Sequence, residues 1–211
     1  MKPSSLKNVR GMYEANADAY SKMMDTEIEL PVYKDMLGRL QAHISNTKGI
    51  LLDTACGSGH MLAMFHSQYD PNRSLMGIDI SPRMVAISKK RLGNNSAVEV
   101  GDMRELPGID SGSVVAVMNF FAIHHLNADE IRISMLEWNR VLVHKGRLLL
   151  AAWEGSGPID YGEESDIVAL RYTSKKLSEI ADSTGFNVTR CSVEPVEDFP
   201  MDAIYLECIK E

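Results

Sequence analysis

The sequence predicts an α/β protein in which a mostly parallel β-sheet is covered by helices on both faces. Two features of its 211 residues indicate this fold. From Gly49 onward, short β-rich runs alternate with helical segments, which is the pattern of parallel strands joined by helical crossovers. Residues 5–48, in contrast, contain no convincing strand. We therefore expect an N-terminal helical cover over residues 1–48 and one α/β domain over residues 49–211.

The cover is predicted to consist of two helices. In the first helix, apolar and aromatic residues recur at helical spacing. These residues are Val9, Met12, Tyr13, Ala17 and Tyr20. A second helix is expected over residues 31–44, because a proline such as Pro31 is favoured in the first turn of a helix.

The α/β domain is predicted to begin with five strands. They cover Ile50–Thr54, Leu75–Ile80, Ala97–Val100, Val114–Met118 and Arg147–Trp153. Helices are expected after the first, second and fourth of them. The helix after the second strand begins at Ser81-Pro82, a favourable N-cap and first-turn pair, and stops at Gly93. The helix after the fourth strand is capped by Asn127 and extends to about Leu142.

The C-terminal part differs, because two strands follow one another without a helix between them. A helix that begins near Ser174 and ends at Gly185 precedes strands at Asn187–Val193 and Ala203–Ile209. The roughly ten residues between these strands are short for a parallel crossover. We therefore expect the two strands to form an antiparallel pair.

The composition is that of an acidic globular protein. The 29 acidic residues exceed the 22 basic ones, which gives a formal net charge of −7, so a large basic surface for a phosphate backbone is not expected. The three cysteines, Cys56, Cys191 and Cys208, are too far apart to indicate a disulfide framework or a zinc site. Because residues 1–10 show no secretory signal and no segment has the pattern of a membrane span, a cytoplasmic location is expected.

One stretch has the pattern of a ligand-binding turn. From Leu51 to Gly59, an apolar strand leads into a turn of small residues and then into a helix. Gly57 and Gly59 lack Cβ atoms where a ligand must approach the backbone. The free N–H groups at the start of the following helix favour a polar ligand at this turn.

Two carboxylates follow at the ends of the next two strands. Asp79 stands 20 residues after Gly59, where a carboxylate can accept hydrogen bonds from both hydroxyls of a ribose. Asp102 ends the third strand, near the position expected for the amino group of an adenine. Each feature is common alone, but the ordered set on successive strands indicates a nucleoside-containing cofactor.

With these motifs the chain resembles the class I S-adenosylmethionine-dependent methyltransferases, in the group that includes the quinone-biosynthesis C-methyltransferases. The resemblance covers residues 49–155 and, more loosely, the C-terminal helix and strands. It implies a Rossmann-like, seven-stranded sheet whose last strand is antiparallel. It also implies S-adenosyl-L-methionine as the cofactor of the domain at residues 49–211.

The resemblance further implies roles for individual residues. Five residues of the turn match the motif around the methionine part of the cofactor: Asp53, Ala55, Cys56, Gly57 and Gly59. Asp79, with Ile80 beside it, matches the ribose site. Asp102 and Met103 match the adenine site, and Asn119 matches a residue whose backbone meets the cofactor amino group.

The chain departs from the family pattern at three places. Ala55 replaces the usual first glycine of the turn, and Ser113 stands where an aspartate commonly opens the fourth strand. His144-Lys145 replaces a proline–glycine pair before Gly146. None of these positions is a ribose or adenine carboxylate, so cofactor binding is still expected.

Three residues are candidates for chemistry at the methyl acceptor. His124 and His125 follow the fourth strand, at the sheet edge where open α/β proteins bind ligands. Imidazole titrates near neutrality, so one of them is a candidate general base, and a positioning or helix-capping role is weighted equally. Glu154, after the fifth strand, is the second candidate. Two adjacent histidines without a third ligand do not indicate a metal site, and Cys56 is expected to be a packing residue.

Aromatic residues are expected around the acceptor. Tyr13 and Tyr20 lie seven residues apart on one face of the first helix, where they form either a lid over the cofactor and substrate or part of the core. The use of an N-terminal helix as a cover in related enzymes favours the lid. Phe120, Phe121 and Trp153 are expected to form apolar walls of the substrate pocket.

The sequence thus predicts a methyltransferase that acts on a small molecule by in-line displacement. The protein would mainly align the reactants and exclude water. A cover of about 48 residues leaves little chain for a large partner, so nucleic acid is not expected. The acceptor atom and the oligomeric state are left open.

Two alternatives remain beside this interpretation. Methylation of RNA or protein would use a basic face around Lys89, Lys90 and Arg91, although basic residues late in a helix also suit its dipole. A NAD-dependent oxidoreductase is the remote alternative, because Leu62 stands where the dinucleotide fingerprint has a small residue.

Overall fold

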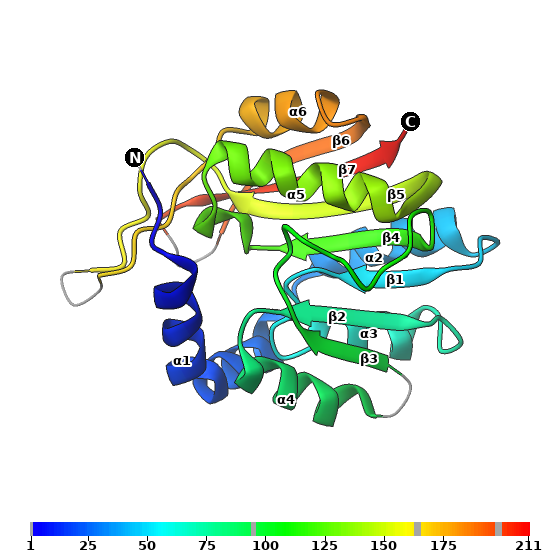
Figure 1. Ribbon diagram of the computed structural model, residues 1–211, viewed down its shortest axis with the longest axis horizontal. Coiled ribbons are helices and arrows are strands. Elements are labelled where there is room, and N and C mark those ends of the chain that lie inside the picture. The colour runs from blue at the N-terminus through cyan, green and yellow to red at the C-terminus, as the bar shows by residue number, and fades with distance from the viewer. Residues whose placement is uncertain (1, 94–95, 163–165, 197–199) are drawn as a thin grey trace.

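The computed structural model describes residues 2–93, 96–162, 166–196 and 200–211. In these residues seven strands form one sheet, in the spatial order β3-β2-β1-β4-β5-β7-β6 (Figure 1). The strands are β1 Ile50–Asp53, β2 Leu75–Asp79, β3 Ser96–Val100, β4 Val114–Phe120, β5 Leu142–Trp153, β6 Phe186–Pro195 and β7 Asp202–Lys210. Strand β7 runs antiparallel to both of its neighbours, and all other neighbouring strands are parallel. The predicted fold class is therefore confirmed.

Helices cover both faces of this sheet (Figure 1). They are α1 Leu6–Glu27, α2 Pro31–Ile44, α3 His60–Gln68, α4 Pro82–Leu92, α5 Ala128–Val141 and α6 Ser174–Asp182. Helices α2 and α3 pack on one face, where Leu37 and Phe65 share a hydrophobic core with Leu51 of β1. Helices α5 and α6 pack on the other, where Trp138 shares a second core with Leu52. Adjacent residues of β1 thus face opposite layers, as the alternation of side chains along a strand requires.

The two helix starts predicted from capping residues are as expected. The Ser81 hydroxyl accepts a hydrogen bond from the N–H of Met84 at 3.3 Å, and α4 begins at the next residue. Asn127 caps α5 in a capping box, because its side chain accepts backbone N–H groups while Glu130 accepts the N–H of Asn127.

Strand β5 begins five residues earlier than predicted, at Leu142 rather than at Arg147. Val114 of β4 pairs with Leu142, but Ala116 pairs with Arg147, so β5 has extra residues over this interval. Lys145 takes a φ of +62° there. At His144-Lys145, where the family pattern has a proline–glycine pair, the structure contains a bulge inside a continuous strand.

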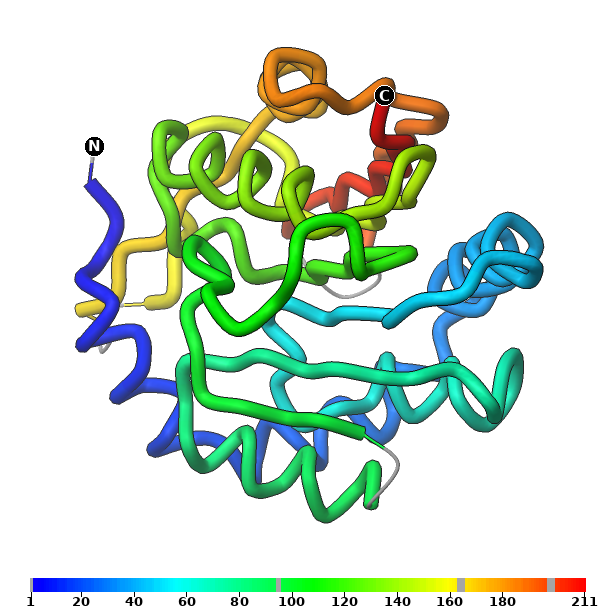
Figure 2. Tube along the Cα trace, turned by 45° about the vertical axis from the view of Figure 1, so that its right-hand side comes forward, coloured from blue at the N-terminus to red at the C-terminus, as the bar shows by residue number. Residues whose placement is uncertain are grey.

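Helix α1 lies across the edge of the sheet where the parallel strands end (Figure 1). The chain before it runs beside a later loop (Figure 2), and the N–H of Ser4 donates to the carbonyl of Val168 at 2.8 Å. Ion pairs join α1 to α4, between Asp18 and Arg83 and between Asp25 and Arg91. Among the described residues, no helix is both long enough and apolar enough to cross a membrane.

Candidate active site

The carboxyl ends of four neighbouring strands, β1 to β4, border a cavity of about 320 Å³. Parallel strands bring the residues that follow them to one edge of a sheet, so motifs far apart in the sequence meet here. Helix α1 and residues 2–5 form the opposite wall. This wall includes Tyr13 and Tyr20 of α1.

Most of the predicted site residues line this cavity. They are Tyr13, Tyr20, Ala55, Gly57, Asp79, Ile80, Asp102, Met103, Phe120, Phe121 and His125. A second group lies outside it: Asp53, Cys56, Gly59, Asn119, His124, Trp153 and Glu154. Of this second group, Asp53 and Cys56 line an adjoining cavity of about 50 Å³ that shares Tyr20, Ala55, Phe120 and Phe121 with the main one.

A side chain at Gly57 would be strained and tightly packed. Its φ is +50°, and a Cβ atom on it would lie 3.2 Å from the ring of Tyr20. The N–H of Gly57 donates to Oδ2 of Asp79 at 2.9 Å, while the N–H of Ser81 donates to Oδ1 at 2.9 Å. The turn after β1 and the end of β2 therefore hold the Asp79 carboxylate at the cavity wall.

Two buried carboxylates stand close to this turn without a cationic partner among the described residues. Burial raises the pKa of Asp53 to about 7, although the N–H of Ala55 donates to it. Burial also raises the pKa of Asp79, against the opposing effect of the N–H groups of Ser81 and Gly57. An unpaired buried charge is unfavourable, so this end of the cavity favours a ligand that carries positive charge.

Cys56 has the properties of the packing residue that the sequence predicted. It is buried in the turn, and burial raises the pKa of its thiol well above the usual value. The thiol therefore stays protonated, whereas nucleophilic cysteines need the thiolate.

The residues predicted for adenine are held from the side of α5. The indole N–H of Trp138 donates to the carbonyl of Met103 at 3.0 Å. Asn119 is fully buried, and its amide donates to the hydroxyl of Thr54 at 3.0 Å and to the Met103 sulfur at 3.4 Å. Asn119 therefore contacts two residues of the cavity wall without lining the cavity itself.

The aromatic wall lies where β4 ends. Phe121 adopts a φ of +50°, an uncommon conformation for a residue with a side chain, and its N–H donates to the carbonyl of Ala151 at 2.9 Å. Its ring packs against Trp153, with centroids 4.6 Å apart. Trp153 thus supports Phe121 from outside the cavity. Strained backbone of this kind concentrates at functional sites.

Tyr13 reaches from α1 to His125 across the cavity. The Tyr13 hydroxyl lies 3.0 Å from Nε2 of His125, and the two rings meet edge to face. Burial lowers the pKa of His125 to about 4 and raises the pKa of Tyr13 well above its usual value. At neutral pH the imidazole is therefore uncharged and the phenol keeps its proton.

His124 and Glu154 have other surroundings. His124 lies in a short 3₁₀ turn, Ile123–His125, and its carbonyl accepts the N–H of Leu170 at 2.7 Å. Burial, and then the neighbouring His125, lower its pKa well below the usual value. The Glu154 carboxylate accepts the N–H of Ser174 at 2.8 Å, at the start of α6. Of the three candidates for the chemistry, the structure brings His125 to the cavity.

We expect His125 to make stability depend on pH. Its folded-state pKa is about 4, against 6.5 for a solvated histidine, so between these values the unfolded chain binds a proton that the folded protein does not. Stability should therefore fall as the pH drops from 6.5 to 4, by about 2–3 kcal/mol from this residue. Urea unfolding of the parent and of His125→Gln at several pH values measures this difference.

His43, an exposed histidine at the end of α2, provides the matched control. His43→Gln should leave the pH profile of the parent unchanged, whereas His125→Gln should make the loss of stability between pH 6.5 and 4 smaller. If His125→Gln and the parent lose stability equally on acidification, the imidazole is not buried in its neutral form.

The cavity is also lined by residues that the sequence analysis did not assign to the site. Thr54, Arg104, Asn127 and Glu130 contribute polar groups, and residues 2–6 contribute part of the cover. The capping pattern Asn-x-x-Glu, from Asn127 to Glu130, would have identified the orientation of Glu130. No comparable signal marks Arg104.

A hydrogen-bonded chain connects α1 to the glycine-rich turn. Asp25 lies 2.7 Å from Nε2 of His60, and Nδ1 of His60 lies 2.9 Å from the hydroxyl of Ser58. Arg91 contacts the residues at both ends of this series of hydrogen bonds, since it donates to the Asp25 carboxylate and to the carbonyl of Ser58. Arg91 therefore belongs to the contact between α1 and the turn rather than to an open basic face.

Residues 51–146 match the model of a methyltransferase domain family. This part of the chain is therefore similar to methyltransferase domains. This match agrees with the family and the cofactor predicted from the sequence, and it does not favour the dinucleotide alternative. In the part of the chain that the structure describes, no cluster of three or more His, Cys, Asp or Glu residues is arranged to hold a metal ion.

Two curated proteins illustrate the relationship. An uncharacterized protein of a Streptomyces fradiae transposon is 30% identical over 167 residues, which are 72% of this chain and 47% of that protein. A ubiquinone/menaquinone biosynthesis C-methyltransferase of Citrifermentans bemidjiense is 28% identical over 110 residues, which are 50% of this chain and 46% of that protein. The chain therefore spans about half the length of the curated relatives it matches.

One solved structure shows how far the fold is shared. The Burkholderia thailandensis 1,6-didemethyltoxoflavin-N1-methyltransferase, with 1,6-didemethyltoxoflavin and S-adenosylhomocysteine bound, superimposes with a TM-score of 0.74. The alignment covers 100% of this chain and 92% of that one, at 17% identity. At this identity the likeness concerns the fold alone.

Proposed function

We propose that the protein transfers the methyl group of S-adenosyl-L-methionine to a small-molecule acceptor in the cavity beneath α1. The observation that carries this proposal is that one cavity contains both halves of such a site. The motif residues after β1, β2 and β3 lie along one side, and the pair of Tyr13 and His125 lies with the aromatic residues at the end of β4.

The residues present fit the cofactor. Asp79 would accept the ribose hydroxyls, Asp102 and Met103 would hold the adenine, and the turn from Asp53 to Gly59 would surround the methionine part. The sulfonium supplies an activated methyl group with a good leaving group. Its positive charge, with that of the amino group, suits the unpaired buried carboxylates Asp53 and Asp79.

The chain itself contributes alignment, exclusion of water and a proton acceptor. Residues 1–48 would provide the cover: α1 closes the cavity, and Tyr20 touches the glycine-rich turn near Gly57. Holding two reactants in line can lower the barrier by ~7–11 kcal/mol in favourable cases. The neutral His125, hydrogen-bonded to Tyr13, would take the acceptor proton, and Phe120 and Phe121 would flank the acceptor.

A small acceptor is supported by three features. The cavity of about 320 Å³ must hold the cofactor as well as the acceptor, which leaves little space for a large acceptor. The chain is acidic, with a net charge of −7, which disfavours nucleic acid. Arg91, one of the three residues of the basic face that RNA or protein methylation would use, is engaged with α1.

A labelled-cofactor screen tests this function. The protein is incubated with S-adenosylmethionine labelled in its methyl group and with three fractions of a cell extract: small metabolites, RNA and protein. We expect label in the metabolite fraction, and much less with Asp79→Ala under the same conditions. Label confined to RNA or protein would reverse the choice of acceptor, and no transfer to any fraction would contradict the proposed activity.

A further inference from the structure

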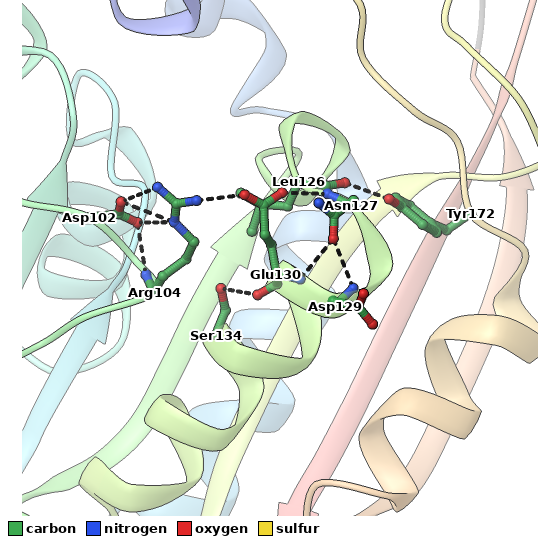
Figure 3. A network of polar contacts seen from close by, with 8 residues as sticks. All are labelled: Asp102, Arg104, Leu126, Asn127, Asp129, Glu130, Ser134 and Tyr172. Carbon is green, nitrogen blue, oxygen red and sulfur yellow. Dashed lines mark hydrogen bonds and ion pairs between the residues drawn. The ribbon is translucent and has the colours of Figure 1, made fainter. Parts of the chain in front are cut away.

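Arg104 lies at the cavity wall between two carboxylates (Figure 3). Its Nη2 group donates to Oδ2 of Asp102 at 2.6 Å, and its Nε group lies 3.0 Å from both oxygens of the same carboxylate. Its Nη1 group donates to Oε1 of Glu130 at 2.7 Å. The guanidinium is therefore held at both of its ends.

Arg104 makes four contacts to the Asp102 carboxylate, two on each oxygen, but a single Nε proton is shared between two of them. In addition to the Nε and Nη2 groups, the backbone N–H of Arg104 donates to Oδ1 at 3.0 Å. Three N–H groups of one residue thus occupy a carboxylate that offers about four acceptor positions. Because both oxygens are paired, Asp102 is not free to rotate, and its remaining acceptor position has a fixed direction.

Glu130 holds the far side of Arg104 in place. Its Oε2 atom accepts the N–H of Asn127 at 2.9 Å, and its own N–H donates to Oδ1 of Asn127 at 3.0 Å (Figure 3). This capping box begins helix α5, which packs on the sheet through its buried face. The position of Arg104 is therefore set by a helix end rather than by a loose surface contact.

The network is better suited to orientation than to stability. The side chains of Asp102, Arg104 and Glu130 are 26%, 24% and 28% exposed. Ion pairs that solvent reaches to this extent contribute little to folding. A bidentate arginine–carboxylate pair nevertheless fixes geometry, because the planar guanidinium matches both carboxylate oxygens.

We propose that Arg104 is a positioning residue that aims Asp102 at the amino group of the cofactor adenine and thereby selects adenine over a 6-oxopurine. This inference rests on the proposed function, in which the cavity binds S-adenosylmethionine. An amino group at position 6 donates to the remaining acceptor position of Asp102. A carbonyl group there has no proton to donate and faces the carboxylate as a second acceptor.

Calorimetry with two ligands tests this role. S-adenosylhomocysteine and S-inosylhomocysteine differ in the 6-amino group, which the second replaces with an oxygen. The parent should bind the adenine form at least ~10-fold more tightly, since a site built for a donor rejects the analogue that lacks it. In Arg104→Gln this preference should fall to about threefold or less, because the Asp102 carboxylate loses its bidentate partner.

Arg140→Gln is the matched control, because Arg140 also pairs with a glutamate of α5, Glu137, but does not line the cavity. It should keep the full preference for adenine even if it lowers stability. If Arg104→Gln does not fold, Arg104→Lys keeps a charge without the bidentate geometry and should also reduce the preference.

The outcomes separate this inference from the proposed function. An Arg104 variant that folds and keeps the parental preference overturns the positioning role while leaving methyl transfer intact. A parent protein that binds S-adenosylhomocysteine without any preference for adenine overturns it as well. A parent protein that binds neither ligand contradicts the proposed function itself.

Discussion

Asp79→Ala should weaken the binding of S-adenosylhomocysteine about 100-fold or more. The Asp79 carboxylate would bind the ribose hydroxyls, and it also accepts the N–H groups of Gly57 and Ser81 at 2.9 Å each. Hydrogen bonds to a charged group contribute about 1.5–3 kcal/mol each. The loss of the two hydrogen bonds to the ribose hydroxyls therefore corresponds to a change in affinity of this size. The substitution also leaves the glycine-rich turn without its partner on β2. Isothermal titration calorimetry measures the affinity directly.

Two further variants show whether the loss of affinity comes from the charge of the Asp79 carboxylate. Asp79→Asn keeps the shape of the side chain but loses the charge, so its affinity should lie between those of the parent and the alanine variant. Asp182→Ala removes an exposed carboxylate at the end of α6 and should bind as the parent does. Parental affinity in Asp79→Ala would remove Asp79 from the binding site. Preferential binding of NADH by the parent would contradict the assignment of the cofactor.

The sequence was sufficient for the fold and for the order of the motif residues. Alternating strands and helices require a parallel sheet, and in such a sheet the residues after each strand meet at one edge. Asp79 and Asp102 are therefore brought to one cavity although they are 23 positions apart along the chain. Capping residues fixed two helix starts, since their hydrogen bonds are local.

The sequence could not predict which side chains at the strand ends point into the cavity. His124 and His125 are adjacent in a 3₁₀ turn, and only the path of that turn decides that His125 lines the cavity. Glu154 follows β5 as predicted, but the start of α6 lies close enough for its carboxylate to accept the N–H of Ser174. Local patterns carry no information on which distant backbone group lies nearby.

The role of α1 also depends on distant contacts that local sequence patterns do not reveal. The spacing of Tyr13 and Tyr20 correctly indicated one helix face, and it left open whether that face covers a ligand or joins the core. The partner of Tyr13 is His125, which is 112 positions away in the chain. Helix α2 packs on the sheet with the core residues, whereas α1 borders the cavity, so the two predicted helices have different surroundings. The boundary of the cover at residue 48 stays a prediction.

Gly59→Ala should lower the free energy of unfolding by about 2–5 kcal/mol and weaken the binding of S-adenosylhomocysteine. Gly59 caps α3 with a φ of +82°, a left-handed conformation that costs about 1–2 kcal/mol for other residues. A Cβ atom at this position would also lie 2.5 Å from the Ser88 hydroxyl and 3.3 Å from the Ser88 Cα atom. Overpacking of this kind adds about 1–3 kcal/mol, because α4 must move away from α3.

Gly157→Ala separates the two causes of the lost stability, backbone strain and overpacking against Ser88. Gly157 has the same φ of +82°, but a Cβ atom on it would meet nothing within 4 Å, so this variant reports the backbone strain alone. Urea unfolding of both variants should therefore show the larger loss for Gly59→Ala, and calorimetry should show weaker cofactor-product binding for that variant only. Equal losses of stability would mean that α3 and α4 adjust freely around Ser88. In that case the close approach of α3 and α4 would not be what requires a glycine at position 59.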